Sequence, residues 1–116
     1  MIHKELNISK KSIALVIDIY QLTSLLPASE KFGLSTQMRK AVVSIPANIA
    51  EGAGRSSTKE YLRFLDIATG SLSELETQLI ICDKLSLLSV NQELFLKIRA
   101  LNKMFYRLKK VLMTRI

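Results

Sequence analysis

Residues 57–84 read STKEYLRFLDIATGSLSELETQLIICDK, and they carry the clearest signal of the fold in this chain. Its apolar residues recur in alternating steps of four and three, which is the heptad spacing of helices that pack almost parallel to one another. Ser57 and Glu60 match a capping box, in which each side chain satisfies an exposed amide of the other residue. The stretch predicts a helix over 58–84 that is roughly 40 Å long at 1.5 Å per residue. Its expected core stripe is Tyr61, Leu65, Ala68, Leu72, Leu75, Leu79 and Cys82.

A helix is also predicted before this one, between Ser35, its expected N-cap, and the run Gly52-Ala53-Gly54. The glycines of this run suit the left-handed residue that closes many helices. Pro46 lies inside the apolar stripe, where it removes a backbone donor and crowds the carbonyl of Val42. We therefore expect a kink at Pro46, or a break into two short pieces.

The first and last helices complete the set. Residues 9–26 are apolar around most of a helix that stops before Pro27, so this helix needs cover on more than one side. In a four-helix domain that leaves a surplus apolar face, which predicts a contact between subunits. The last helix begins near Asn91 and repeats the heptad spacing. Short connections between the helices favour antiparallel neighbours.

The sequence thus predicts an all-α fold, an antiparallel up-down four-helix bundle whose second helix is kinked at Pro46. At 116 residues and 48% hydrophobic content, the chain is long enough for one domain with a single core. We expect residues 1–116 to form that domain and residues 1–8 to be frayed. Gly70 and Ser71 are expected to let a neighbouring helix approach closely.

All of the excess positive charge lies in the last twenty residues. Residues 1–96 contain ten Lys or Arg and ten Asp or Glu, whereas residues 97–116 contain seven Lys or Arg and no acid. A basic row recurs at helical spacing about 200° around the helix from the apolar stripe, so it is expected to face solvent. A neutral body with one basic helix indicates an anionic partner. The expected nucleic-acid contacts are Lys97, Arg99, Lys103, Arg107, Lys109 and Lys110.

A smaller basic group lies near the junction of the second and third helices. Because Glu51, Glu60 and Asp66 are close in sequence, local ion pairs are the simpler interpretation, and these residues are only secondary contacts. Tyr106 is the one residue of the basic helix that could offer a stacking ring. Binding is therefore expected to be led by phosphate contacts and to depend on salt, without base-specific readout. The secondary basic residues are Arg39, Lys40, Arg55, Lys59 and Arg63.

The residue inventory argues against an enzyme, a metal site and a cofactor. The only histidine is His3, which removes Glu-x-x-His metal ligands and any Ser-His or Cys-His nucleophile. Cys82 is most simply a small core residue, and a single cysteine suits a reducing cytoplasm. The sequence contains neither a membrane-spanning stretch nor a signal peptide. Binding to a membrane surface ranks last, because the apolar face of the last helix has to close the bundle.

Two runs carry a family resemblance. GLSTQMRKAVVSIPANIAEG over 33–52 and YLRFLDIATGSLSELETQL over 61–79 resemble the signature of a bacterial four-helix-bundle family. These proteins are encoded in intervening sequences of large-subunit ribosomal RNA genes, and the resemblance covers roughly residues 12–112. It implies up-down bundles that assemble into a five-fold ring. The family is also distantly similar to the accessory variability determinant of diversity-generating retroelements, which works with a reverse transcriptase and RNA through a positive surface.

Two functions remain open from the sequence. The first is a non-catalytic homo-oligomer that binds RNA or DNA, with RNA favoured, without sequence specificity and through its basic C-terminal helix. If the resemblance extends to a homopentamer, +7 per chain becomes about +35, which attracts polyanions strongly. The alternative is a ring-shaped adaptor that docks an acidic protein partner and has no nucleic-acid role.

Overall fold

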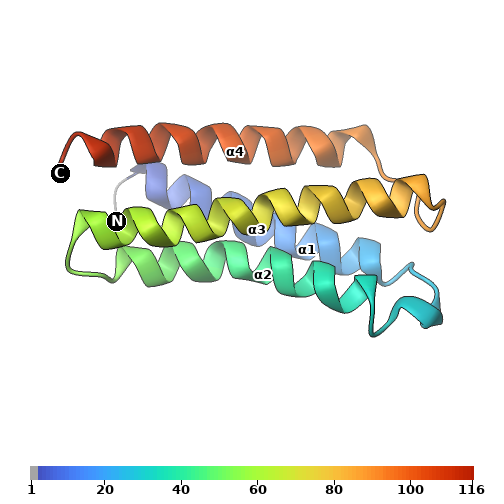
Figure 1. The fold of residues 1–116 in the computed structure, drawn as a ribbon. Helices are drawn as coiled ribbons and strands as arrows, with labels where there is room; N and C mark the ends of the chain where they lie inside the picture. The colour runs from blue at the N-terminus through green and yellow to red at the C-terminus, as the bar shows by residue number, and fades with distance from the viewer. Residues whose placement is uncertain (1–2) are drawn as a thin grey trace.

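The computed structural model describes residues 3–116, and over that range the chain is all-helical and contains no strand. Figure 1 shows consecutive α-helices side by side and running in opposite directions. The prediction of an all-α, four-helix fold is confirmed. The elements are α1 (His3–Thr23), the short 3-10 helix η1 (Ala28–Glu30), α2 (Leu34–Ala53), α3 (Thr58–Lys84) and α4 (Gln92–Met113).

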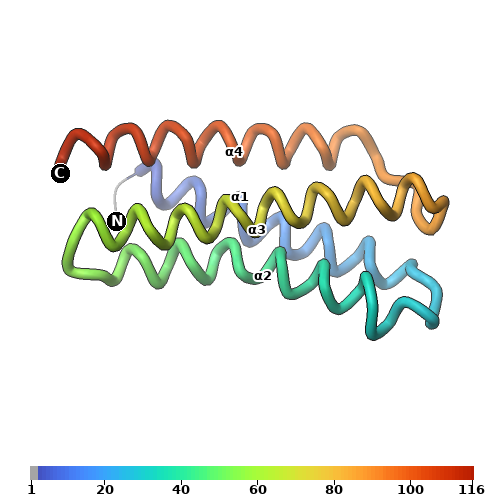
Figure 2. The backbone as a smooth tube through the Cα atoms, in the orientation of Figure 1, coloured from blue at the N-terminus to red at the C-terminus, as the bar shows by residue number. Residues whose placement is uncertain are grey.

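Each α-helix packs against two others. The backbone of α2 lies close to those of α1 and α3, and the backbone of α4 lies close to those of α3 and α1, whereas α1 and α3, and likewise α2 and α4, stand diagonally opposite. The start of α1, the α2–α3 connection and the end of α4 gather at one end of the bundle, which we name the terminal end (Figure 2). The other two connections lie at the opposite end, named the loop end. Segments far apart in the sequence are therefore neighbours at each end.

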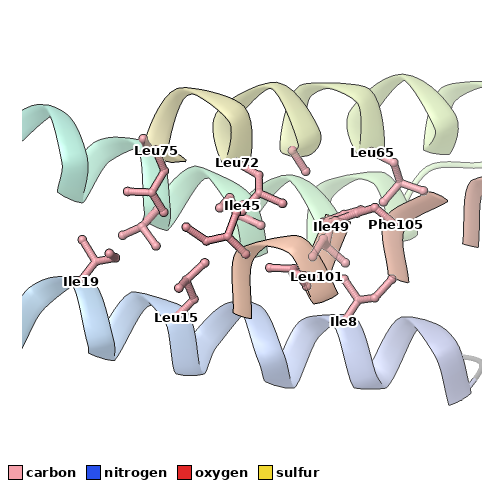
Figure 3. Packing of buried hydrophobic residues seen from close by; sticks show 14 of the residues in the cluster. Ile8, Leu15, Ile19, Ile45, Ile49, Leu65, Leu72, Leu75, Leu101 and Phe105 are labelled. Atoms are coloured by element: carbon pink, nitrogen blue, oxygen red, sulfur yellow. The ribbon is translucent and has the colours of Figure 1, made fainter. Parts of the chain in front are cut away.

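The core forms around the predicted stripe of α3, all seven of whose residues are buried. Figure 3 shows Leu65, Leu72 and Leu75 of α3 among side chains from α1, α2 and α4. Cys82 belongs to this core, since its Sγ lies 3.7 Å from Sδ of Met38. Burial, followed by the negative charge of Glu30, raises the pKa of the Cys82 thiol. These contacts support the interpretation of Cys82 as a packing residue.

The N-terminal segment differs from the prediction. Residues 3–8 are helical rather than frayed, while residues 1–2 lie outside the described part of the chain. Ile8 is fully buried and points into the core (Figure 3), and Glu5 is only 8% exposed. Burial and the negative charge of Glu5 together raise the pKa of Tyr61, which lies on α3. The helix α1 therefore packs against the rest of the bundle from its first turns. The charged and polar residues of this segment make its buried face hard to recognise from the sequence.

The N-terminus of α2 is also capped differently from the prediction. The helix begins at Leu34 with Gly33 as its N-cap, so Ser35 does not cap it. Instead, Oε1 of Glu30 accepts a hydrogen bond from the backbone N of Leu34 at 3.3 Å. The carboxylate of a neighbouring turn thus satisfies one of the amides that a helix start leaves free.

The expected left-handed closure of α2 is wrong. Gly54 has a φ of −84°, and no described glycine has a positive φ. Gly52 lies buried inside the helix, where an added Cβ would stand 2.8 Å from Cβ of Phe64 and 2.8 Å from Cδ1 of Tyr61. The glycine is therefore required for the close approach of α2 to α3, and not for a turn.

Near its middle, α2 continues through Pro46 as one helix, so the expected break into two pieces does not occur, and the kink stays a prediction. Ser71 of α3 lies against this part of α2, with its Oγ 2.8 Å from Oγ of Ser44. Gly70 does not fit the expectation of close approach, because an added Cβ would meet no atom within 4 Å.

Candidate nucleic-acid interface

The outer face of α4 carries the predicted basic row. Arg99, Lys103, Arg107 and Lys110 are exposed, and none of them forms an ion pair with any residue of the described range 3–116. The row faces solvent because residues on the opposite side of α4 fill the core. Those buried residues are Ile98, Leu101, Phe105, Leu108 and Leu112.

The other two predicted contacts on α4 have structural partners. Nζ of Lys97 lies 3.1 Å from Oδ2 of Asp18 on α1. Nζ of Lys109 lies 2.9 Å from Oδ1 of Asp66 and donates to Oγ1 of Thr69 at 3.0 Å, both on α3. These lysines tie the two flanks of α4 to its neighbours. Half-exposed ion pairs of this kind contribute little to stability, but they reduce the charge that Lys97 and Lys109 offer to a partner.

The secondary basic group does not form one patch. Arg39 lies toward the loop end, where its Nε donates to Oγ1 of Thr23 at 2.9 Å and its guanidinium stacks 4.4 Å from the ring centroid of Tyr20. Its role is to close the C-terminus of α1, because its Nη2 also donates to the carbonyl of Tyr20 at 3.3 Å. Lys40 follows it on α2, exposed and without an ion pair among residues 3–116.

The rest of that group lies at the terminal end, and the local ion pairs expected there are confirmed for two arginines. Arg55 pairs with Glu51 at 2.6 Å, and Arg63 pairs with Glu60 at 2.9 Å. Both guanidinium groups also lie against the ring of Phe64, at 4.7 and 4.6 Å from its centroid. Lys59 is exposed and has no ion pair within the described chain.

The positive charge of the folded chain is concentrated at one end of the bundle, and not only on one helix. Divided at mid-helix, the half at the terminal end comprises residues 3–13, 45–71 and 103–116 and contains eleven Lys or Arg against four Asp or Glu. The other half contains six of each sign, so the whole excess of +7 belongs to the terminal half. Counting along the chain hides this separation because antiparallel packing brings three distant segments to one end.

Three lysines that the sequence did not single out add to the positive charge of the terminal half. Lys4, Lys10 and Lys11 on α1 are exposed. Lys4 and Arg107 line the same shallow cleft between α1 and α4, and Lys11 shares a second cleft with Lys97. Once α1 and α4 are known to pack side by side, the helical spacing of Lys4 and Lys11 places both on the side of α1 that faces α4. The sequence alone contains no signal that they adjoin the basic row.

A second exposed feature is an apolar stripe on the outside of α1, as predicted for the surplus face of the first helix. Its members range from 41% to 55% exposed, which is high for large apolar side chains in the middle of a helix. We name it the α1 stripe. It consists of Leu6, Ile13, Ile17 and Tyr20.

The described range, residues 3–116, lacks both a metal site and a membrane-spanning helix. That range contains no group of three or more His, Cys, Asp or Glu side chains that could hold a metal ion. It also contains no helix with the length and apolar character needed to cross a membrane.

Comparison with known proteins gives one family and one fold. The sequence model of a family described as "23S rRNA-intervening sequence protein" matches residues 4–107. A crystal structure of a protein of unknown function from the S23 ribosomal protein family of Bacteroides thetaiotaomicron is similar, with a TM-score of 0.68 and 24% identity over 96% of each chain. No curated protein matches the sequence. The family match spans all four helices, and the chain therefore belongs to the family of 23S rRNA-intervening sequence proteins.

Proposed function

We propose that this protein is a non-catalytic, oligomeric helical bundle that binds nucleic acid, with RNA favoured, through the basic surface of its terminal half. The observation that supports the proposal is the row of four exposed cations on α4 without acidic partners in the described chain. Three of them, Lys103, Arg107 and Lys110, lie in the half that holds all the excess charge. A cation without an intramolecular partner can neutralise a phosphate without first losing an ion pair. RNA is favoured over DNA because of the distant similarity to the accessory variability determinant, which works with RNA through a positive surface.

The chemistry of the row supports binding to the backbone rather than readout of sequence. Lysine and arginine on a convex helix face can meet phosphates, but phosphate contacts carry no sequence information. The row also lacks the short amide side chains that pair with base edges in grooves. We therefore propose binding that tolerates many sequences and depends strongly on salt.

A salt series tests the proposal. The purified protein, freed of nucleic acid with nuclease and of known mass, is titrated with single-stranded RNA at several salt concentrations. The logarithm of the binding constant should fall linearly with the logarithm of salt concentration, with a slope of about −3 or steeper, since each of the four free cations contributes about 0.7. The absence of binding at the lowest salt, or a slope near zero, would contradict the proposal.

We further propose that the α1 stripe joins copies of this chain into a ring of five. Four large apolar residues along one line of α1 are exposed on the outside of the bundle, although the guanidinium of Arg39 stacks on Tyr20 at one end of the line. A stripe that docks on a different surface of the next copy produces a closed ring when the rotation closes. Such a ring would also bring five basic surfaces together.

Replacing both Ile13 and Ile17 with glutamate should dissolve this assembly. Two charges in the α1 stripe cannot be buried without partners, whereas each side chain stays solvated in the monomer. Light scattering should give about 65 kDa for the parent, as for five chains, and 13.1 kDa for the variant. The matched control replaces Ile67 and Ile81, which are exposed on α3, and should keep the parental mass. A parent that is monomeric, or a variant with parental mass, would refute the assignment of this stripe.

One observation favours the second candidate, an adaptor for an acidic protein. Leu96 is 53% exposed and lies on the outer side of α4, less than one turn from Arg99. An apolar residue amid cations suits a protein interface more than a phosphate backbone. If the salt series shows no RNA binding, recovery of one acidic protein from nuclease-treated extract would support the adaptor.

A further inference from the structure

A polar groove runs between α3 and α4 in the basic half of the bundle. It is shallow, with a volume of about 420 Å³, and it opens to solvent beside the basic row of α4. Two long side chains of α4 line it, namely Tyr106 and Lys109, and Lys109 reaches across to Asp66 and Thr69 of α3. Its lining includes Asp66, Thr69, Gly70, Ser73, Asn102 and Tyr106.

Tyr106 gives this groove an accessible aromatic face. The side chain is 64% exposed, and Nζ of Lys110 lies 5.5 Å from its ring centroid. Lys103 and Lys110 stand about one helical turn before and after the ring on α4, so cations flank it on both sides. A ring between two phosphate-binding groups is the arrangement on which single-stranded nucleic acids stack their bases.

Gly70 keeps the wall opposite this ring free of side chain. A Cβ at this position would meet no atom within 4 Å, so nothing inside the chain requires glycine there. A glycine in the middle of a helix is less favourable than alanine by about 0.5–1 kcal/mol. The open space above its backbone therefore belongs to the groove, and a flat ligand can lie against it.

The rim of the groove supplies polar groups for the edge of such a ligand. The exposed amide of Asn102 offers both a donor and an acceptor. Asp66 is held at the rim by Lys109, at 2.9 Å, and its side chain is 72% exposed. A nucleobase has two flat faces and polar atoms along its edges, which match this set of groups.

We infer that the groove between α3 and α4 binds one unpaired nucleobase, which stacks on Tyr106 over Gly70 while its flanking phosphates lie on Lys103 and Lys110. This inference rests on the proposed function and adds to it a preference for single-stranded over duplex RNA. Stacking is available to every base, so this contact adds affinity without selecting a sequence. A base that stays paired in a duplex cannot enter the groove.

Binding of a 12-nucleotide RNA with 2-aminopurine at a central position tests the inference, beside a duplex of the same sequence. The parent should quench the fluorophore and bind the single strand more tightly than the duplex. Tyr106→Leu should remove the quenching and weaken single-strand binding about tenfold while leaving duplex binding unchanged. Gly70→Leu should have the same effect by filling the groove. Leucine favours a helix more than glycine does, so this variant should also be at least as stable as the parent.

The control is Phe32→Leu, which removes an aromatic ring that is 87% exposed in the neutral half and should leave both affinities unchanged. Unaltered quenching and single-strand affinity in Tyr106→Leu and Gly70→Leu would overturn the nucleobase site while leaving the proposed function standing. Failure of the parent to bind either RNA at low salt would overturn both.

Discussion

Reversing the charges of Arg99, Lys103 and Arg107 to glutamate is expected to weaken RNA binding by about 100-fold or more at 0.1 M salt. Each lost phosphate contact removes about 0.7 from the salt slope, so three contacts account for about two decades of affinity at that concentration. The slope of the logarithm of the binding constant against the logarithm of salt concentration should become shallower by about 2 at the same time. All three residues are exposed and without ion pairs within residues 3–116, so the substitutions should leave the melting temperature close to that of the parent.

A matched variant separates the local surface from the total charge. Lys31, Lys40 and Lys84 are exposed lysines in the neutral half, and reversing all three lowers the formal net charge from +7 to +1, as the first triple does. In filter-binding assays at several salt concentrations, the RNA affinity of this control should be much closer to that of the parent than to that of the first variant. Equal losses in the two triples would mean that only net charge matters. If the variant of Arg99, Lys103 and Arg107 bound RNA as tightly as the parent, α4 would not be part of the interface.

Replacing Gly52 with alanine is expected to lower the free energy of unfolding by about 2 kcal/mol. The new Cβ would stand 2.8 Å from carbon atoms of Tyr61 and Phe64 and 3.2 Å from the Tyr61 carbonyl oxygen. Overpacking of this kind typically costs 1–3 kcal/mol, and here it would force α2 away from α3. The gain in helix propensity offsets only part of that cost.

The same substitution at Gly70 is the control, because it should change the free energy of unfolding in the opposite direction. Space around Gly70 is open, so alanine there should raise the free energy of unfolding by about 0.5–1 kcal/mol. Urea denaturation followed by circular dichroism measures both variants on one scale. If Gly52→Ala were as stable as the parent, the contact between α2 and α3 would be looser than the structure shows.

The parts of the fold that could be predicted are those that arise from a repeating pattern of apolar residues. The α3 stripe from Tyr61 to Cys82 repeats every three or four residues, and burial follows directly from that repeat. Features that depend on single contacts between elements escaped prediction. Glu30 caps α2 from a preceding turn, and Glu5 is buried through the packing of α1. Neither contact leaves a repeating pattern in the chain.

The same distinction holds for the candidate interface. Arg99, Lys103 and Arg107 could be placed on the outside of α4 because their angle from the core stripe is a property of one helix. The partner of Lys97 could not be foreseen, since Asp18 lies 79 positions earlier in the chain. Lys4 and Lys11 were overlooked for a related reason, because they adjoin α4 only after the bundle closes.

The separation of charge between the two halves also has a kinetic consequence. A rod with +7 at one end and a balanced opposite end has a large electric dipole along its 46 Å axis. In the field of a polyanion such a dipole experiences a torque, so the molecule turns its positive end forward before any atoms touch. Orientation in advance of contact shortens the rotational search that normally slows association between specific surfaces. Cations far from the final contact would then set how fast the protein arrives, while those on α4 would set how long it stays.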